Sequence, residues 1–367
     1  MSGAPEVWTL PELPGVLTST EVAASGAHLC ALQRPDGMIP WFEGGHCDPW
    51  NHVESAMALS VCGRVDEAVA AYGWLARAQL GDGSWFNYYQ GDRVKDARID
   101  TNTCAYVATG VWHHYCVTGD EAFLDERFAM VEAALDFVLR CQLVDGTIRW
   151  SLDATGRPEG YALLTGSSSI FHALRCGVAT AEELGAARPD WELAAGRLGH
   201  AVAHHPGAFA PKNEYAMDWY YPVLCGALEG PAANARLDAG IATYALEGLG
   251  VRCVSTNDWV TAAETAECAM ALDALGRRDE ALTVLAQTAA HRRDDGSYFT
   301  GIAYPSRATF PDGETTSYTA AAVVLAADAL SSTTRAAGLF RGEHLAPALD
   351  LAAGRCRGAA SATCTAA

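Results

Sequence analysis

Long apolar runs and basic residues are both scarce in this chain. No run of 18 or more apolar residues occurs, and residues 1–18 lack the basic start and apolar stretch of a secretory signal. The 25 Lys and Arg residues are outnumbered by 44 Asp and Glu residues, and the formal net charge of −19 is spread along the chain. This distribution argues against nucleic acid or an anionic membrane as a partner. We expect a soluble, cytoplasmic protein without a membrane span.

Paired cysteine motifs are also missing, although the chain has twelve cysteines. No Cys-x-x-Cys pair occurs, so the common zinc and redox spacings are absent. Most of the cysteines fall inside apolar helical stretches, as Cys62, Cys104 and Cys268 do. We therefore predict reduced thiols, no metal site and no cofactor.

What the chain does have is an internal repeat of about 55 residues, in which two kinds of helical stretch alternate. One kind is small, apolar and rich in Ala, and it occurs at 48–62, 100–117, 165–184, 218–228, 260–275 and 315–330. The other kind has a charged face, and it occurs at 19–32, 65–79, 121–142, 190–204, 232–246 and 279–292. A helix that is apolar all round lies inside, whereas a helix with a polar face lies outside. Six inner and six outer helices predict an all-α fold, a single closed (α/α)6 toroid.

The same pattern sets the domain boundaries. We predict an N-terminal arm at 1–18, the toroid domain at 19–334 and a disordered tail at 335–367, which is rich in Ala, Gly, Ser and Thr. Links from inner to outer helices are short, whereas links from outer to inner helices are long and aromatic. Because long loops on a rigid scaffold commonly carry function, we expect the site at the end where the inner helices begin.

Four of the long links open with variants of one phrase, at 33–41, 79–85, 142–150 and 291–298. Asp-Gly makes a tight turn because glycine accepts positive φ, and the following aromatic residue folds back over the helix end. This Gln-x-x-Asp-Gly-x-Trp phrase resembles the repeat of squalene–hopene cyclases and protein prenyltransferase β-subunits, over most of residues 19–330. The resemblance implies an aromatic cavity in which a carboxylic acid protonates an isoprenoid. The cyclase acid lies in an Asp-x-Asp-Asp-Thr-Ala context, and residues 96–102 keep its Asp-Thr but not its spacing.

A second resemblance involves the six-hairpin, glucoamylase-like glycosidases. Their alternation of long and short links is similar to that of this chain, and residues 314–322 resemble the opening of their last inner helix. This resemblance implies two carboxylates that flank a glycosidic bond. Both families place their chemistry where the inner helices begin, so the fold alone does not choose between them.

Acidic residues gather at these predicted helix starts. Residues at equivalent helix starts in a closed toroid surround its axis, so we predict that the carboxyls of four hairpins converge on one pocket. At least one carboxyl there should have a raised pKa. The predicted catalytic residues are Asp100, Asp218, Glu264 and Glu314. The predicted substrate-binding residues are His52, Tyr161, Ser168, Trp219, Tyr220, Trp259 and Tyr318.

Three functions remain open at this point, each with a small molecule as the ligand. The first is a terpenoid cyclase or prenyltransferase-like enzyme that acts on an isoprenoid. The alternative is a glycoside hydrolase, or a related sugar-active enzyme, that uses two carboxylates. The third is a binding toroid without catalysis. The cavity distinguishes them, because a deep apolar tunnel suits a polyprenyl chain and a polar bowl suits a sugar.

Overall fold

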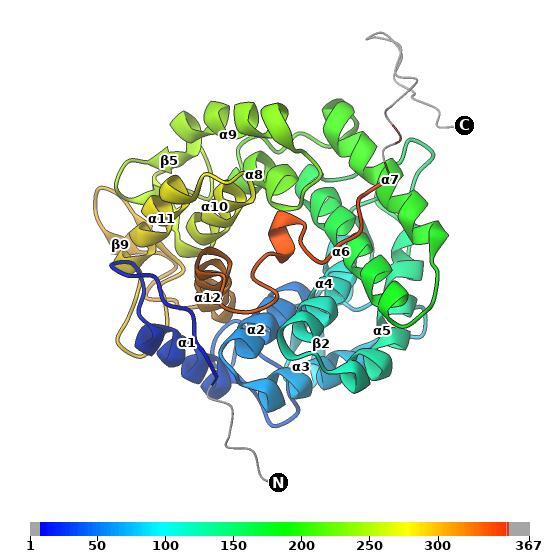
Figure 1. The fold of residues 1–367 in the computed structure, drawn as a ribbon, viewed down its shortest axis with the longest axis horizontal. Helices are drawn as coiled ribbons and strands as arrows, with labels where there is room; N and C mark the ends of the chain where they lie inside the picture. Colours follow the sequence, from blue (N-terminus) through cyan, green and yellow to red (C-terminus); the bar gives the residue numbers. More distant parts are fainter. Residues whose placement is uncertain (1–7, 350, 352–367) are drawn as a thin grey trace.

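The chain folds into two concentric rings of α-helices (Figure 1). The computed structural model describes residues 8–349 and 351, and these form twelve α-helices. The inner ring consists of α2 (Pro49–Val61), α4 (Thr101–Thr118), α6 (Leu164–Glu183), α8 (Ala216–Leu224), α10 (Ala262–Ala274) and α12 (Ser317–Ser331). The outer ring consists of α1 (Ser19–Leu32), α3 (Val65–Ala78), α5 (Glu121–Leu139), α7 (Pro189–His204), α9 (Gly230–Tyr244) and α11 (Arg278–Ala286). The predicted (α/α)6 toroid is confirmed.

Composition separates the two rings. In α12, 13 of the 15 side chains are buried, because the helix is packed on all sides. In α3 the buried side chains lie on one face, whereas Asp66, Glu67 and Arg77 stand on the outer surface. Small apolar side chains let the inner helices approach one another around the axis, and the amphipathic helices cover them.

The Asp-Gly phrases hold the outer ring together. The side-chain amide of Gln33 donates to the carbonyl of Gly37 in its own turn and to that of Glu67 on the next outer helix, at 3.1 and 2.8 Å. Gly37 has φ +91°, and a Cβ there would lie 2.2 Å from a backbone oxygen of α3, so only glycine fits. The last phrase closes the ring, because the Ser25 hydroxyl on α1 donates to the Gly296 carbonyl at 3.0 Å.

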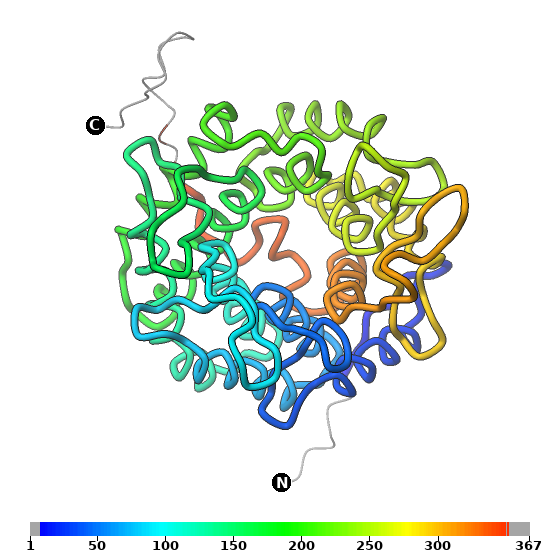
Figure 2. The backbone as a smooth tube through the Cα atoms, turned by 180° about the vertical axis from the view of Figure 1, so that it is seen from behind, coloured from blue at the N-terminus to red at the C-terminus, as the bar shows by residue number. Residues whose placement is uncertain are grey.

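The loops that lead into the inner helices carry short antiparallel strands, and Figure 2 brings these loops to the front. The sheets within the described residues are β1 (Tyr88–Gln90) with β2 (Arg93–Asp96), β3 (Ile99–Asp100) with β4 (Ser151–Leu152), β5 (Ala245–Leu246) with β6 (Gly250–Val251), and β7 (Trp259–Thr261) with β8 (Gly301–Ala303) and β9 (Ala308–Thr309). The β3–β4 pair joins two neighbouring loops and sets Asp100 opposite Ser151. Strands this short leave no period in the sequence, so they were not predicted.

The C-terminal segment crosses the other end of the barrel, where the 3-10 helix η3 (Leu339–Arg341) lies at the centre of the ring in Figure 1. Leu339 is fully buried, and Arg341 donates to Asp273 at 2.6 Å. These contacts correct the prediction of a disordered tail from residue 335 onward, since the segment packs against α6, α10 and α12. Residue 350 and residues 352–367 of that predicted tail lie outside the described residues, as do residues 1–7 of the predicted arm.

Cysteines and helix hydropathy complete the description of residues 8–349 and 351. The ten cysteines within these residues are all free thiols, and the two at 356 and 364 lie outside them. None of the helices in this part of the chain combines the length and the apolar character needed to cross a membrane.

Candidate active site

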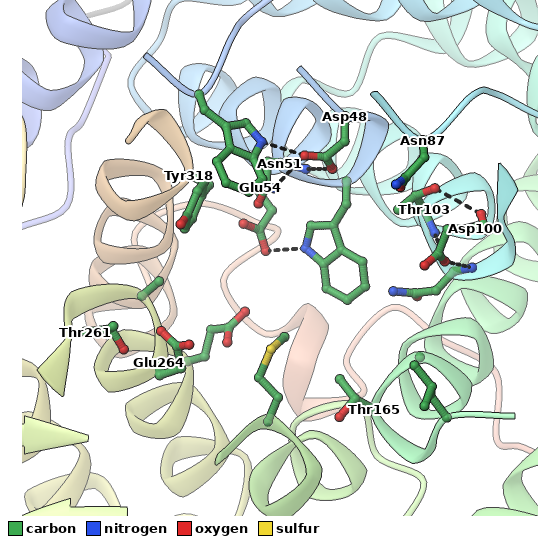
Figure 3. A pocket seen from close by; sticks show the side chains of 18 of the residues that line it. Asp48, Asn51, Glu54, Asn87, Asp100, Thr103, Thr165, Thr261, Glu264 and Tyr318 are labelled. Atoms are coloured by element: carbon green, nitrogen blue, oxygen red, sulfur yellow. Dashed lines mark hydrogen bonds between the residues drawn. The ribbon is translucent and has the colours of Figure 1, made fainter. Parts of the chain in front are cut away.

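A cavity of about 380 Å³ lies at the end of the barrel where the inner helices begin (Figure 3). Its walls come from all six inner helices or the loops that lead into them. The carboxyl residues that line it are Asp48, Glu54, Asp100, Glu264 and Glu267. The indoles that line it are Trp41, Trp50, Trp150 and Trp259. Acidic groups from three helices therefore share one space with large aromatic rings.

Asp48 is the N-cap of α2 and is held by three donors. One oxygen accepts from the Asn51 backbone N–H at 3.0 Å. The other accepts from the Trp41 indole at 2.6 Å and from the Asn51 amide at 2.7 Å. Burial raises the pKa of Asp48, whereas these hydrogen bonds lower it. The helix end and the donors together fix the direction of this carboxyl.

Asp100 repeats this arrangement at the start of α4. One of its oxygens accepts from the backbone N–H groups of Asn102 and Thr103, at 2.8 and 3.2 Å. The other accepts from the Trp150 indole at 2.6 Å, which the β3–β4 pair brings within reach. Burial raises the pKa of Asp100 to about 6, although the three hydrogen bonds oppose it. The predicted raised pKa in the pocket is thus present at this residue.

Glu54 and Glu267 lie deeper and form a coupled pair. The Trp50 indole donates to Glu54 at 3.0 Å, and the hydroxyls of Tyr220 and Tyr221 donate to the two oxygens of Glu267. Burial raises the pKa of Glu54 well above its usual range, and the charge of Glu267 adds to this effect. Burial also raises the pKa of Glu267 to about 7, against the two tyrosine hydrogen bonds. A proton therefore resides in this pair near neutral pH.

Glu264 is the third residue of α10, one helical turn from Glu267. Figure 3 shows it across the cavity from Asp48, with Tyr318 of α12 between them. After burial, the charges of Glu264, then Glu314 and then Asp48 raise the pKa of Tyr318. Glu264 and Asp48 thus face the same part of the cavity from two sides.

Two further features of the lining point to a ligand. The Asn102 side-chain oxygen and the Thr261 hydroxyl are buried at the cavity and have no hydrogen-bond partner among the described residues. Since buried polar atoms are normally paired, these two suit a ligand that brings hydroxyl groups. A separate part of the wall, between α6 and α8, presents the apolar side chains of Leu163 and Met217.

The four predicted catalytic residues do not all reach this cavity. Asp100 and Glu264 line it. Asp218 is turned toward α6, where it accepts from the Thr165 backbone N–H at 3.3 Å and from the Thr165 hydroxyl at 2.5 Å. Glu314 stays in its loop beside Thr300, whose hydroxyl donates to it at 3.3 Å. Asp218 and Glu314 thus lie behind the lining, so the predicted convergence of four carboxyls is corrected to two.

The predicted substrate-binding residues divide in the same way. Trp259 and Tyr318 line the cavity, and the ring of the exposed Tyr161 lies 5.5 Å from that of Trp150 at the rim. The other four are packed away from the cavity. His52 is fixed between two backbone groups, Ser168 bonds a carbonyl of its own helix, Trp219 stacks on Tyr244, and Tyr220 reaches the site only through Glu267.

Sequence reasoning missed several lining residues and underrated one. Asp48 and Glu54 belong to the acidic residues that gather at the start of the first predicted inner helix, but they were not among the predicted catalytic residues. Glu54 and Glu267 are charged residues inside Ala-rich inner helices, and this was the available signal, because an unpaired charge is costly in such a place. Trp41 and Trp150 were assigned to turns, and the structure shows that their indoles also hold the site carboxyls.

The ionisable side chains that line this cavity are carboxyls and tyrosine hydroxyls. The described residues hold no group of three or more His, Cys, Asp or Glu side chains arranged to bind a metal ion. No histidine of the described chain lines the cavity. The groups available for proton transfer there are carboxyls, together with the phenol hydroxyls of Tyr88 and Tyr318.

Comparison with known proteins gives one close relative by sequence. No protein-family model matches the chain. The chain is 48% identical over 341 residues to the "MMP endo-(1,4)-3-O-methyl-alpha-D-mannosidase" of Mycolicibacterium hassiacum, which covers 93% of this chain and 94% of that protein.

Solved structures support the fold at low sequence identity. A wild-type glycosidase is 16% identical with a TM-score of 0.66, covering 86% of this chain and 99% of the glycosidase. The cellobiose 2-epimerase of Spirochaeta thermophila is 15% identical with a TM-score of 0.64, covering 86% and 96%. A D-mannose isomerase is 12% identical with a TM-score of 0.63, covering 86% and 96%. At these identities the likeness shows the toroid alone.

These comparisons contradict the expected isoprenoid chemistry. The relative and the glycosidase neighbours act on sugars by name, and none of the three solved structures described above is named as an isoprenoid enzyme. The physical reason for the error is the Gln-x-x-Asp-Gly-x-Trp phrase, which builds turns of the outer ring and carries no information on the substrate. The resemblance to the six-hairpin glycosidases holds.

Proposed function

Because the chain belongs to the family of the MMP endo-(1,4)-3-O-methyl-alpha-D-mannosidase, we propose that it is a glycoside hydrolase. Its substrate is a (1,4)-linked chain of 3-O-methyl-α-D-mannose, which it cleaves at internal bonds. The observation that carries this proposal is the cavity, in which carboxyls from opposite sides share one space with indole rings. Glycosidic hydrolysis needs two such carboxyls, and sugar faces stack well on aromatic rings.

Asp48 and Glu264 are the proposed catalytic pair. Glu264 donates its proton to the glycosidic oxygen as the C1–O bond breaks, and Asp48 accepts a proton from the water that attacks C1. Both oxygens of Asp48 already accept hydrogen bonds, which suits a carboxylate that orients water better than one that attacks carbon. Glu264 lies one turn from Glu267, whose pKa burial raises to about 7.

Asp100 has a binding role in this proposal. Its oxygen is aimed into the cavity by Trp150, and its neighbour Asn102 presents an unpaired amide oxygen. Both atoms accept hydrogen bonds, so they suit the hydroxyl groups of a mannose ring. A polar site of this kind discriminates strongly against ligands that lack the hydroxyl, because its own groups would then stay unpaired.

The apolar part of the wall suits the methyl ether. Leu163, at the start of α6, and Met217 of α8 both line the cavity. An O-methyl group that is placed there buries its methyl away from water, and it has no O–H that needs an acceptor. A free hydroxyl in the same place would lose hydrogen bonds to water without replacement.

A sugar epimerase or isomerase is the competing possibility, since two structural neighbours carry such names. Those likenesses concern the fold alone, and the cavity has no histidine among its described lining residues. The hydrolase proposal therefore stands without a second candidate.

The test is hydrolysis by the purified protein. A (1,4)-linked oligosaccharide of 3-O-methyl-α-D-mannose is incubated with it, in parallel with the unmethylated oligosaccharide, and the products are sized by mass spectrometry. We expect internal fragments with new reducing ends from the methylated chain and at least about tenfold slower cleavage of the unmethylated chain. Unchanged chain length in both reactions would overturn the proposal.

A further inference from the structure

Three cavities follow one another along the barrel axis. Beneath the active-site cavity lies a small cavity of about 20 Å³, which shares Glu54 and Glu267 with it. A third cavity, of about 370 Å³, lies toward the short-loop end and shares His172 and Phe340 with the small one. Few side chains therefore separate Glu54 and Glu267 from the far end of the barrel. One of them comes from outside the helical repeat.

That side chain is Phe340 of η3, in the C-terminal segment. Figure 3 shows the faint red ribbon of this segment behind the site residues. The Phe340 ring stacks on His172 of α6, with centroids 4.8 Å apart and an interplanar angle of 8°. Its neighbours anchor it, because Leu339 is fully buried and Arg341 donates both to Asp273 and to the Ala329 carbonyl.

We propose that this C-terminal segment is the floor of the active site, and that Phe340 is a positioning residue that keeps water from reaching Glu54 and Glu267 from below. The inference deepens the proposed hydrolase function and rests on it. The two carboxyls meet the active-site cavity above and the small cavity below, so the floor controls the access of water to them from below. Where water is excluded, Glu54 and Glu267 share a proton near Glu264. Where water reaches them, both ionise and place negative charge near Glu264.

Other ionisable groups face the pair from the neighbouring helices. They are Asp48 of α2, Tyr106 of α4, His172 of α6, Tyr220, Tyr221 and the adjoining Cys225 of α8, and Glu264 of α10. The side chains that α12 contributes to the small cavity, Ala322 and Leu325, do not titrate. Burial lowers the pKa of His172 to about 3, so it stays neutral and brings no charge to the floor. Removing Phe340 therefore changes hydration around the pair without removing a charged partner.

The experiment compares three variants of the full chain. Phe340→Ala removes the ring from the floor, and Phe340→Leu fills part of the space that the ring occupied. Leu345→Ala is the control, because Leu345 belongs to the same segment but does not line the small cavity. Protein labelled with ¹³C at glutamate Cδ is titrated by NMR, and Glu54→Gln and Glu267→Gln assign the signals. We expect the apparent pKa values of the pair to fall by a unit or more in Phe340→Ala, by less in Phe340→Leu, and not in Leu345→Ala.

Kinetics give a second readout. On the methylated oligosaccharide, Phe340→Ala should lower kcat at least tenfold with KM changed less than threefold, and Phe340→Leu should restore much of the rate. If both Phe340 variants titrate like the wild type, or if Leu345→Ala shifts the pair equally, the floor proposal is wrong. The titration needs no substrate. If Phe340→Ala lowers the pKa values of the pair but the wild type cleaves no mannoside, the hydrolase proposal is wrong and the floor proposal holds.

Discussion

Helices α2 and α4 have different environments at their two ends, and the difference explains where the chemistry lies. At their N-termini, Asp48 and Asp100 face the shared cavity. Toward their C-termini, the Ser60 hydroxyl and the His114 ring are fully buried and bond each other at 2.8 Å. The carboxyls at one end line a cavity, whereas the Ser60 hydroxyl and Nδ1 of His114 at the other end bond each other. A polar residue on an inner helix is thus a site candidate where its side chain lines a cavity, as Asp48 and Asp100 do.

Helix dipoles reinforce this comparison. All six inner helices point their N-termini at the cavity, and a helix N-terminus stabilises negative charge. At the opposite end of α12, two C-terminal carbonyls accept from cations, since Arg341 donates to the Ala329 carbonyl and Arg278 to the Leu330 carbonyl. The dipole of α12 therefore suits arginines at the end away from the cavity.

The largest expected effect concerns the carboxyls at the mouth. Asp48→Asn and Glu264→Gln each remove a group that transfers a proton, so kcat should fall about 10³-fold while Tm changes by a few degrees. Steady-state kinetics with thermal unfolding measure both. Asp218→Asn is the matched control, because Asp218 is the third residue of its inner helix, as Glu264 is, but bonds Thr165 instead. It should keep its activity and lose about 1 kcal/mol of stability; comparable activity losses in all three variants would refute the assignment.

A smaller effect is expected from the indoles of the Asp-Gly phrases. Trp150→Phe removes the donor to Asp100, and since a hydrogen bond to a charged group contributes about 1.5–3 kcal/mol, KM should rise at least about tenfold. Trp85→Phe, in an equivalent phrase, removes a donor to the Leu75 carbonyl away from the cavity. It should lower Tm and leave KM unchanged. Equal changes in KM for the two variants would show that these tryptophans affect only the folding of the loops and not the binding of substrate.

The far end of the same helices should respond in stability only. Ser60→Ala leaves the buried Nδ1 of His114 without its partner, which costs about 1–3 kcal/mol. Chemical denaturation measures this loss, and kcat/KM on the methylated oligosaccharide should stay within about twofold of the wild type. A large fall in kcat/KM for Ser60→Ala would show that the far end of the inner helices also affects catalysis, against the contrast between the two ends.

The smallest effect is the pH dependence of stability. The pKa of Glu267 is raised from 4.5 to about 7 in the folded protein, so its contribution to stability is present below 4.5 and is lost as pH rises through 7. Glu267→Gln cannot ionise, and its Tm relative to the wild type should therefore climb by a few degrees between about pH 4.5 and 7. Thermal unfolding in a series of buffers checks this, and a constant difference would mean that Glu267 is already ionised across that range.

The fold was largely predictable because its signals are local. Helix α1 has the predicted bounds, since apolar periodicity and an Asp-Gly turn mark its ends. The site was only partly predictable, because a place at a helix start sets the position of a residue along the barrel axis. It does not set the direction in which the side chain points. Glu264 and Asp218 are both third residues of inner helices, yet only Glu264 lines the cavity. The substrate class was misjudged because the Asp-Gly phrase serves the architecture.

In the proposed reaction, Glu264 and Asp48 add water across an internal mannosidic bond. Cleavage of the (1,4)-linked 3-O-methyl-α-D-mannose oligosaccharide in H₂¹⁸O, followed at once by mass spectrometry, tests this claim directly. We expect shorter chains that carry ¹⁸O at C1 of the new reducing end, formed by the wild type and not by Glu264→Gln. Chains that keep their length, or an ¹⁸O label on the other side of the cleaved bond, would contradict it.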